Sequence, residues 1–115
     1  MIYRIADLAD WETARTTGFF ASADLAVEGF IHTSEQAQIL ETARRYYAGR
    51  AALVLLEVDE AILSAAGVRH ERNWVASREA FFTHVFGPVP LGAITRRWAF
   101  ATDAAGVFTL PSELY

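Results

Sequence analysis

The stretch ALVLLEV, residues 52–58, is an almost continuous run of apolar residues, most of them branched. A short run of this kind, without alternating polar positions, is typical of a strand that is buried on both faces. Asp59 follows directly and can cap a short helix at residues 60–66, which Gly67 ends. The sequence therefore predicts a fully buried strand followed by a short helix.

Further strands are predicted on both sides of this run. Residues 1–6, MIYRIA, alternate between two faces, as the residues of a strand do. Polar residues 72–79 are expected to be irregular, and GPVP at residues 87–90 is expected to be a turn. The remaining predicted strands are residues 29–34, 68–71, 80–86, 91–100 and 107–115.

Two more helices are predicted upstream. Asp10 is expected to N-cap the first, which ends near Gly18, and residues 21–29 are expected to form a loop. Ser34 is expected to N-cap a longer helix at residues 35–49, where apolar residues recur at helical spacing. Because strands and helices follow one another without a regular repeat, the sequence predicts an α+β fold.

Composition narrows the class of protein. The chain has 115 residues, so we expect one domain at residues 1–115, and its 53% hydrophobic content is typical of a globular protein. A net charge of −4 disfavours binding to long nucleic acids. The absence of cysteine excludes disulfides and thiolate zinc sites. The apolar runs are too short for a membrane span and the start is unlike a signal peptide, so we expect a soluble, cytoplasmic protein.

Histidines are the first candidates for a functional site. His32 lies in GFIHTS, residues 29–34, beside the hydroxyls of Thr33 and Ser34. His84 shares a strand face with aromatic residues and lies near a turn. Each histidine either packs in the core with its nitrogens hydrogen-bonded or lines a cleft. The three histidines show no paired spacing of the kind that metal sites use, so no metal site is predicted.

Charged residues gather near both histidines. Asp24 and Glu28 precede the His32 segment, where they either orient the imidazole or keep a loop soluble. The segment between Glu71 and Glu79 carries two arginines and a tryptophan. Such a segment can stack a base and bind a phosphate, or it can be a solvated loop whose charges pair with one another.

Several motifs then occur in an order that resembles a known family. They are GFIHTS followed by Gln36, TARRYY at 42–47, LVLLEVD at 53–59 and FTHVFGPVPL at 82–91. On these motifs the chain resembles, along nearly its whole length, the small bacterial proteins of the domain of unknown function 952 family. The family usually has tryptophan where this chain has His70 and proline where it has Thr83, so His70 is less expected to belong to a shared site.

This family is similar to the ADP-ribosyltransferase-like superfamily. The resemblance implies two packed, curved, mostly antiparallel sheets with a cleft between them and a few short helices outside. It implies that His84 or Glu71 is the catalytic group, with Glu79 as an alternative. It implies that the ligand-binding residues are Arg4, His32, Thr33, Ser34 and Trp74.

The function implied is that of a protein that binds, or transfers a group from, NAD or another ADP-ribosyl compound. His32, His84 and Arg4 would line the cleft, NAD would be a ligand or substrate, and no cofactor would be required. Breaking the nicotinamide–ribose bond develops positive charge on the ribose, which a carboxylate stabilises. The alternative is a non-catalytic module that binds a ligand or a protein through residues 87–91 and exposed aromatic residues. The oligomeric state stays open.

Overall fold

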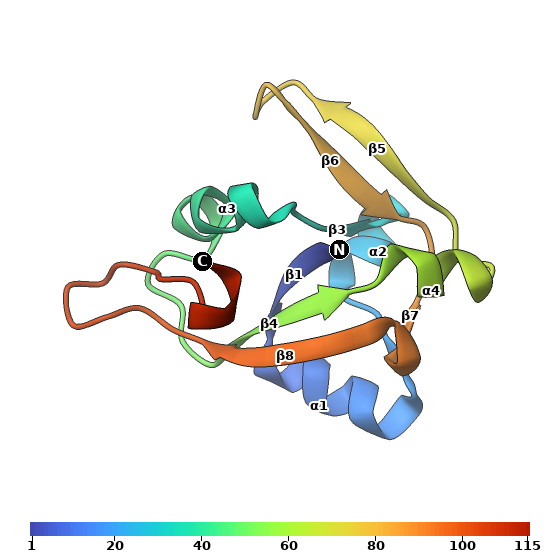
Figure 1. The fold of residues 1–115 in the computed structure, drawn as a ribbon, viewed down its shortest axis with the longest axis horizontal. Coiled ribbons are helices and arrows are strands. Elements are labelled where there is room, and N and C mark those ends of the chain that lie inside the picture. Colours follow the sequence, from blue (N-terminus) through green and yellow to red (C-terminus); the bar gives the residue numbers. More distant parts are fainter.

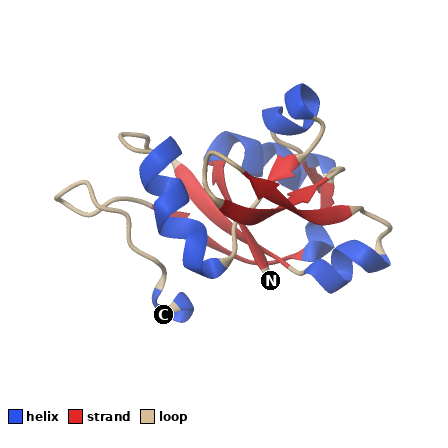
Figure 2. Ribbon diagram, turned by 90° about the horizontal axis from the view of Figure 1, so that it is seen from above, coloured by secondary structure: helices blue, strands red, loops and turns tan.

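The structure is a computed structural model that describes residues 1–115. Its strands are β1 (Ile2–Asp7), β2 (Phe19–Phe20), β3 (Ile31–His32), β4 (Leu53–Val58), β5 (His70–Val75), β6 (Ala80–Val85), β7 (Val89–Pro90) and β8 (Ile94–Phe100). Its helices are α1 (Leu8–Thr17), α2 (Ala23–Glu28), α3 (Ile39–Tyr46) and α4 (Glu60–Ala65), with short 3-10 helices at Gln36–Gln38, Leu91–Ala93 and Ser112–Leu114. The helices lie outside the strands (Figures 1 and 2), and the predicted α+β class is confirmed.

The strands form three antiparallel sheets. Two have three strands, in the orders β1-β4-β8 and β3-β6-β5, and the third pairs β2 with β7. A single bridge between Tyr3 and Ser34 links β1 to the chain just after β3. The β5–β6 hairpin extends away from the β1-β4-β8 sheet (Figure 1). The chain segment at residues 31–34 therefore joins the two larger sheets.

Strand β4 is buried along its whole length, which confirms the prediction for residues 52–58. Its side chains alternate between two apolar clusters, with Leu56 in one and Leu55 in the other. Trp11 of α1 belongs to the Leu56 cluster, and Ile39 of α3 belongs to the Leu55 cluster. In Figure 1, α1 and α3 lie on opposite sides of the β1-β4-β8 sheet. Apolar partners on both faces explain why the strand is apolar at every position except Glu57.

The helices differ in part from the prediction. Helix α1 begins at Leu8, two residues before the predicted Asp10 cap. Residues 23–28, expected to be a loop, form α2, which ends at Gly29 in the left-handed conformation with φ 87°. The predicted helix at 35–49 begins as a 3-10 turn capped by Glu35, and α3 ends at Tyr46. No helix combines the length and the apolar character that crossing a membrane requires.

Strand β5 extends from the predicted strand at 68–71 into residues 72–75, which were expected to be irregular, and part of the predicted turn at 87–90 is also a strand. One predicted strand, at 107–115, is largely absent. Residues 70–75 pair with β6 along their full length, although none of their side chains is buried. Val89 and Pro90, expected in a turn, pair with β2. The tail at 107–115 forms one isolated bridge, between Thr102 and Phe108, and then a 3-10 turn. Backbone pairing of a hairpin does not require an apolar face, so periodicity missed β5 beyond residue 71.

One carboxylate is buried within this core. Glu57 is 3% exposed and accepts hydrogen bonds from the Tyr3 hydroxyl at 2.9 Å and the Thr95 hydroxyl at 2.8 Å. The Arg96 guanidinium donates to both of its oxygens, at 3.0 and 2.7 Å. The bonds from Arg96, followed by those from Thr95 and Tyr3, lower the pKa of Glu57 from 4.5 to about 2. This network ties β1, β4 and β8 together.

We expect Glu57→Gln to lower the free energy of unfolding at pH 7 by about 1–3 kcal/mol, because a buried hydrogen-bonded charge is lost. Since the folded-state pKa of Glu57 is depressed, its contribution is present above pH 4.5 and is lost as the pH falls toward about 2. Urea unfolding from pH 7 to pH 2 should therefore show the native and variant stabilities converging. The control is Glu12→Gln, in an exposed ion pair with Arg15. Parallel pH curves for the native protein and Glu57→Gln would contradict the assignment.

Candidate functional site

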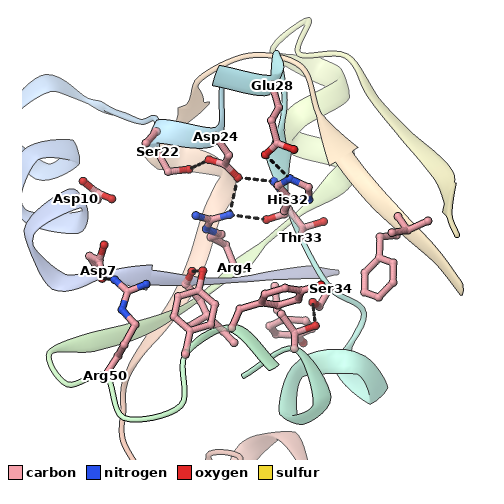
Figure 3. Close-up of a pocket in the computed structure, with 18 of the residues that line it drawn as sticks. Arg4, Asp7, Asp10, Ser22, Asp24, Glu28, His32, Thr33, Ser34 and Arg50 are labelled. Atoms are coloured by element: carbon pink, nitrogen blue, oxygen red, sulfur yellow. Dashed lines mark hydrogen bonds and ion pairs between the residues drawn. The ribbon is translucent and has the colours of Figure 1, made fainter. Parts of the chain in front are cut away.

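A cavity of about 640 Å³ lies beside β1 and the residue 32–34 segment. Its lining comes from β1, α2, α3 and the β5–β6 hairpin, and Figure 3 shows most of these side chains. The cavity is within the size range of small-molecule sites. The lining residues with charged side chains are Arg4, Asp7, Asp10, Asp24, Glu28 and Arg50, and those with hydroxyls include Ser22, Thr33, Ser34 and Thr42.

An ion pair between Arg4 and Asp24 occupies the centre of the lining. Arg4 Nη1 lies 2.7 Å from Asp24 Oδ2 and also donates to the carbonyl of His32 at 3.1 Å (Figure 3). The backbone N–H of His32 donates to the same Asp24 oxygen at 2.9 Å, and Ser22 donates to the other. Arg4 and Asp24 thereby hold β3 against β1 and α2.

The protonation of Asp24 follows from these contacts. Burial by itself would raise the pKa of Asp24, but the Arg4 charge and the hydrogen bonds from His32, Ser22 and Arg4 outweigh it. The pKa of Asp24 is therefore lower than its usual value, and the carboxylate stays ionised at neutral pH. Only 15% of the Arg4 side chain and 12% of the Asp24 side chain are exposed. If one of these two charges were removed, water could not solvate the remaining charge in its place.

Glu28 and His32 form a second pair on the cavity wall. His32 Nε2 lies 2.8 Å from Glu28 Oε2, and about half of each side chain is exposed. The carboxylate fixes the orientation of the ring, which is one of the two roles predicted for the acids before β3. The imidazole of His32 faces the cavity together with Glu28 (Figure 3). This pair can exchange a proton with a bound ligand.

The other charges and hydroxyls of the lining are also paired. Arg50 forms an ion pair with Asp7. The hydroxyls of Ser34 and Thr42 lie 3.1 Å apart (Figure 3). The lining contains four carboxylates and two guanidinium groups, and both guanidinium groups already contact a carboxylate. The cavity wall is therefore acidic, and neither of its own arginines is free to neutralise an anion.

His84 lies behind the cavity and does not line it. It is 6% exposed, stacks on Phe30 with ring centroids 4.1 Å apart, and has its Nδ1 3.0 Å from Asn73 Oδ1. Burial lowers the pKa of His84, and the neighbouring His32 lowers it further. The His84 and His32 rings are 5.3 Å apart, so the structure brings the two histidines together, with only His32 at the cavity surface.

The structure thus places only some of the predicted site residues in the cavity lining. Arg4, His32, Thr33 and Ser34 line the cavity, whereas Glu71 and Trp74, on β5, do not. Glu71 forms an exposed ion pair with Arg69, which directly precedes β5. Trp74 is 56% exposed and packs edge-on against Phe81. No group of three or more His, Cys, Asp or Glu side chains is arranged to hold a metal ion.

Several lining residues were not singled out from the sequence. Asp7, Asp10, Arg50, Thr42 and Tyr47 reach the cavity from the β1–α1 junction, α3 and the loop after it. Arg50 and Asp7 are 43 positions apart, and no local pattern links them. Thr42 and Tyr47 belong to the TARRYY segment, but a motif does not reveal which side chains face a shared space.

The comparisons with known proteins identify the family. Residues 5–97 match the family described as protein of unknown function, DUF952. The chain is similar to the crystal structure of protein CC0527 from Caulobacter crescentus, with 34% identity, a TM-score of 0.86, and coverage of 98% of this chain and 96% of that chain. It is also similar to the solution NMR structure of CC0527, with 38% identity, a TM-score of 0.72, and coverage of 92% and 89%. No curated protein matches. The chain belongs to the DUF952 family, as its motifs predicted.

We expect Asp24→Ala to lower the free energy of unfolding by about 3–5 kcal/mol, because it leaves the Arg4 charge buried without a partner. Chemical denaturation at pH 7 measures this loss. Asp10→Ala is the matched control, since Asp10 lines the same cavity and makes no hydrogen bond or ion pair, and its effect should stay within about 0.5 kcal/mol. Equal losses in the two variants would mean that the Arg4–Asp24 pair does not hold the site together.

Proposed function

We propose that the cavity binds NAD or a related ADP-ribosyl compound, with the ribose beside Glu28 and His32. The observation that supports this most directly is the exposed carboxylate of Glu28, which no arginine contacts, beside the exposed imidazole of His32 on the cavity wall. The nicotinamide ring of NAD is cationic, so its ring and the attached ribose suit this wall better than a phosphate does. Hydroxyl and carboxylate groups of the lining can accept hydrogen bonds from the ribose hydroxyls.

In this proposal Glu28 is the group that meets the developing charge of the reaction. Cleavage of the nicotinamide–ribose bond leaves positive charge on the ribose, and a carboxylate nearby lowers the free energy of that transition state. Of the acids in the cavity, Asp24 is occupied by Arg4, Ser22 and His32, whereas Glu28 contacts only His32 and is about half exposed. Glu71 and His84, the catalytic candidates implied by the resemblance, lie outside the cavity lining, so Glu28 takes that role here.

Arg4 has a positioning role in the same proposal. The resemblance implies that it contacts the NAD backbone, but its Nη1 is committed to Asp24 and to the His32 carbonyl. Through these contacts Arg4 sets the position of His32 and the ionised state of Asp24. The ligand then meets Arg4 as part of a neutral pair.

We expect NAD or ADP-ribose to raise the thermal stability of the native chain, and His32→Ala to abolish that rise. A ligand at 100 times its Kd adds about 2.7 kcal/mol, which for a chain of this size raises the Tm by roughly 10 °C. His32→Ala removes the imidazole but keeps the backbone N–H and carbonyl that contact Asp24 and Arg4. Differential scanning calorimetry with each ligand at about 1 mM measures the effect.

Glu71→Gln is the control, because Glu71 is an acid of similar exposure that lies outside the cavity. It should keep the ligand-induced rise in Tm. If NAD and ADP-ribose stabilise the native chain and His32→Ala equally, or stabilise neither, the proposal is wrong.

A second candidate function is that of a non-catalytic module that binds a second copy of the chain. Trp74 and Phe81 face each other across the β5–β6 hairpin with ring centroids 5.2 Å apart, and they are 56% and 46% exposed. The hairpin extends away from the rest of the molecule (Figure 1), and β5 is an edge strand. Residues 87–91, the other expected surface, do not contribute, since Val89 is buried and Leu91 packs against the core.

If this hairpin is an interface, the native chain should be a dimer in multi-angle light scattering and Trp74→Ser should be a monomer. Large exposed aromatic residues dominate the energetics of interfaces, so one substitution suffices. Val27→Ser is the control, because Val27 is 82% exposed on α2 and lies away from the hairpin. A native chain that is monomeric at all concentrations rules this candidate out.

A further inference from the structure

Two arginines of the chain are without an acidic partner. All ten basic residues are arginines, and eight of them form salt bridges with carboxylates. The other two are Arg78, in the turn between β5 and β6, and Arg97, on β8. The chain has a net charge of −4, so its carboxylates outnumber its arginines. An arginine that contacts none of these carboxylates is unusual, and its charge needs a functional explanation.

Arg78 does not itself line the cavity, but it is fixed against three residues that do. Its Nη2 donates to Thr42 Oγ1 at 3.1 Å, and its guanidinium carbon lies 4.6 Å from the centroid of the Phe82 ring and 5.6 Å from that of Tyr46. Thr42, Phe82 and Tyr46 all line the cavity. One hydrogen bond and two aromatic rings hold the guanidinium in place, and most of its N–H donors remain unused.

The hydroxyls beside Arg78 are oriented by it. An arginine can only donate, so Thr42 Oγ1 accepts from Arg78 and can donate its own proton to Ser34 Oγ, 3.1 Å away. The hydroxyl of Ser34 is then left to donate to an acceptor in the cavity, which Ser34 also lines. A cation and a hydroxyl donor therefore converge on one region of the cavity.

We infer that Arg78 recognises a phosphate group of the ligand, together with the hydroxyl of Ser34. The inference rests on the proposed function and adds the ligand class, a phosphate ester or pyrophosphate. Arg4 and Arg50 are neutralised by Asp24 and Asp7, so Arg78 is the cation beside this cavity that has no acidic partner. A guanidinium with unused donors matches the oxygens of a phosphate in charge and in geometry.

This assignment gives the cavity two chemically different ends. Glu28, whose carboxylate contacts no arginine, makes one end acidic. Ser34 and Thr42, with Arg78 hydrogen-bonded to Thr42, make the other end a donor of hydrogen bonds. Figure 3 shows Ser34 below the group formed by Asp24, Glu28 and His32. A ligand with an anionic group at one end and a cationic or hydroxyl-rich group at the other fits this polarity in one direction only.

Isothermal titration calorimetry with inorganic pyrophosphate, ADP-ribose and adenosine tests the inference on the full chain. For ADP-ribose and pyrophosphate, Arg78→Gln should raise the Kd by about 10- to 100-fold, since a charged hydrogen-bonding partner is lost. Arg78→Lys, which keeps the charge, should raise it less. Adenosine lacks phosphate, so its affinity should be the same in the native chain and in Arg78→Gln.

Arg97→Gln is the matched control, because Arg97 also has no acidic partner and lies over an aromatic ring, that of Trp11, but does not contact the cavity. Its Kd values should equal those of the native chain. Thermal unfolding without ligand should give the same Tm for Arg78→Gln and Arg97→Gln, which excludes misfolding as the cause of a lost affinity.

The outcomes separate the inference from the proposed function. If ADP-ribose binds and His32→Ala weakens it while Arg78→Gln does not, the role of Arg78 is overturned and the proposed function stands. If pyrophosphate binding depends on Arg78 but NAD and ADP-ribose bind no more tightly than pyrophosphate, the phosphate site stands and the ADP-ribosyl function fails. If neither pyrophosphate nor ADP-ribose binds at about 1 mM, both are overturned.

Discussion

Two backbone hydrogen bonds between Tyr3 and Ser34, each 2.8 Å long, join the two larger sheets of the molecule. Beyond this bridge, β1 continues along β4 while β3 pairs with β6, so the edge of β1 that follows Tyr3 has no strand beside it. A strand edge without a partner must be covered by side chains or left to solvent. Here Arg4, Asp24 and His32 cover part of it, and the rest borders the cavity. The candidate site thus lies where the two sheets, joined at the Tyr3–Ser34 bridge, separate from each other.

The electrostatics of the site depend on the same geometry. Arg4 extends from β1 to Asp24 on α2 and to the carbonyl of His32 on β3, so one guanidinium links three elements. Because Asp24 is nearly enclosed, this pair is a structural charge pair, and the chemistry of the cavity is left to the more exposed Glu28 and His32. Arg78, the arginine beside this cavity that no carboxylate neutralises, comes from the hairpin of the other sheet. Each end of the cavity is therefore built by a different part of the fold.

The buried parts of the fold were predictable because burial leaves a pattern in the sequence. Residues 52–58 are apolar at nearly every position, and β4 is buried at every position. Helix α2 and most of strand β5 were missed for the opposite reason, since neither element contains a buried residue and neither carries an apolar stripe. Their structure depends on a glycine cap at Gly29 and on backbone pairing with β6. Such features constrain the main chain without constraining most side chains.

The sequence by itself determined the α+β class, the family, and the types of side chain that a site could use, because local periodicity and ordered motifs are properties of neighbouring residues. It also marked Arg4, His32, Thr33 and Ser34, which all reach one cavity. Only the tertiary structure decided how charges combine, since Arg4 and Asp24 are 20 positions apart and Arg78 and Thr42 are 36 apart. A sequence does not distinguish an arginine that is paired with a carboxylate from an arginine that has no acidic partner. They differ in what they can bind, because the energy of a charge depends on its neighbours in space.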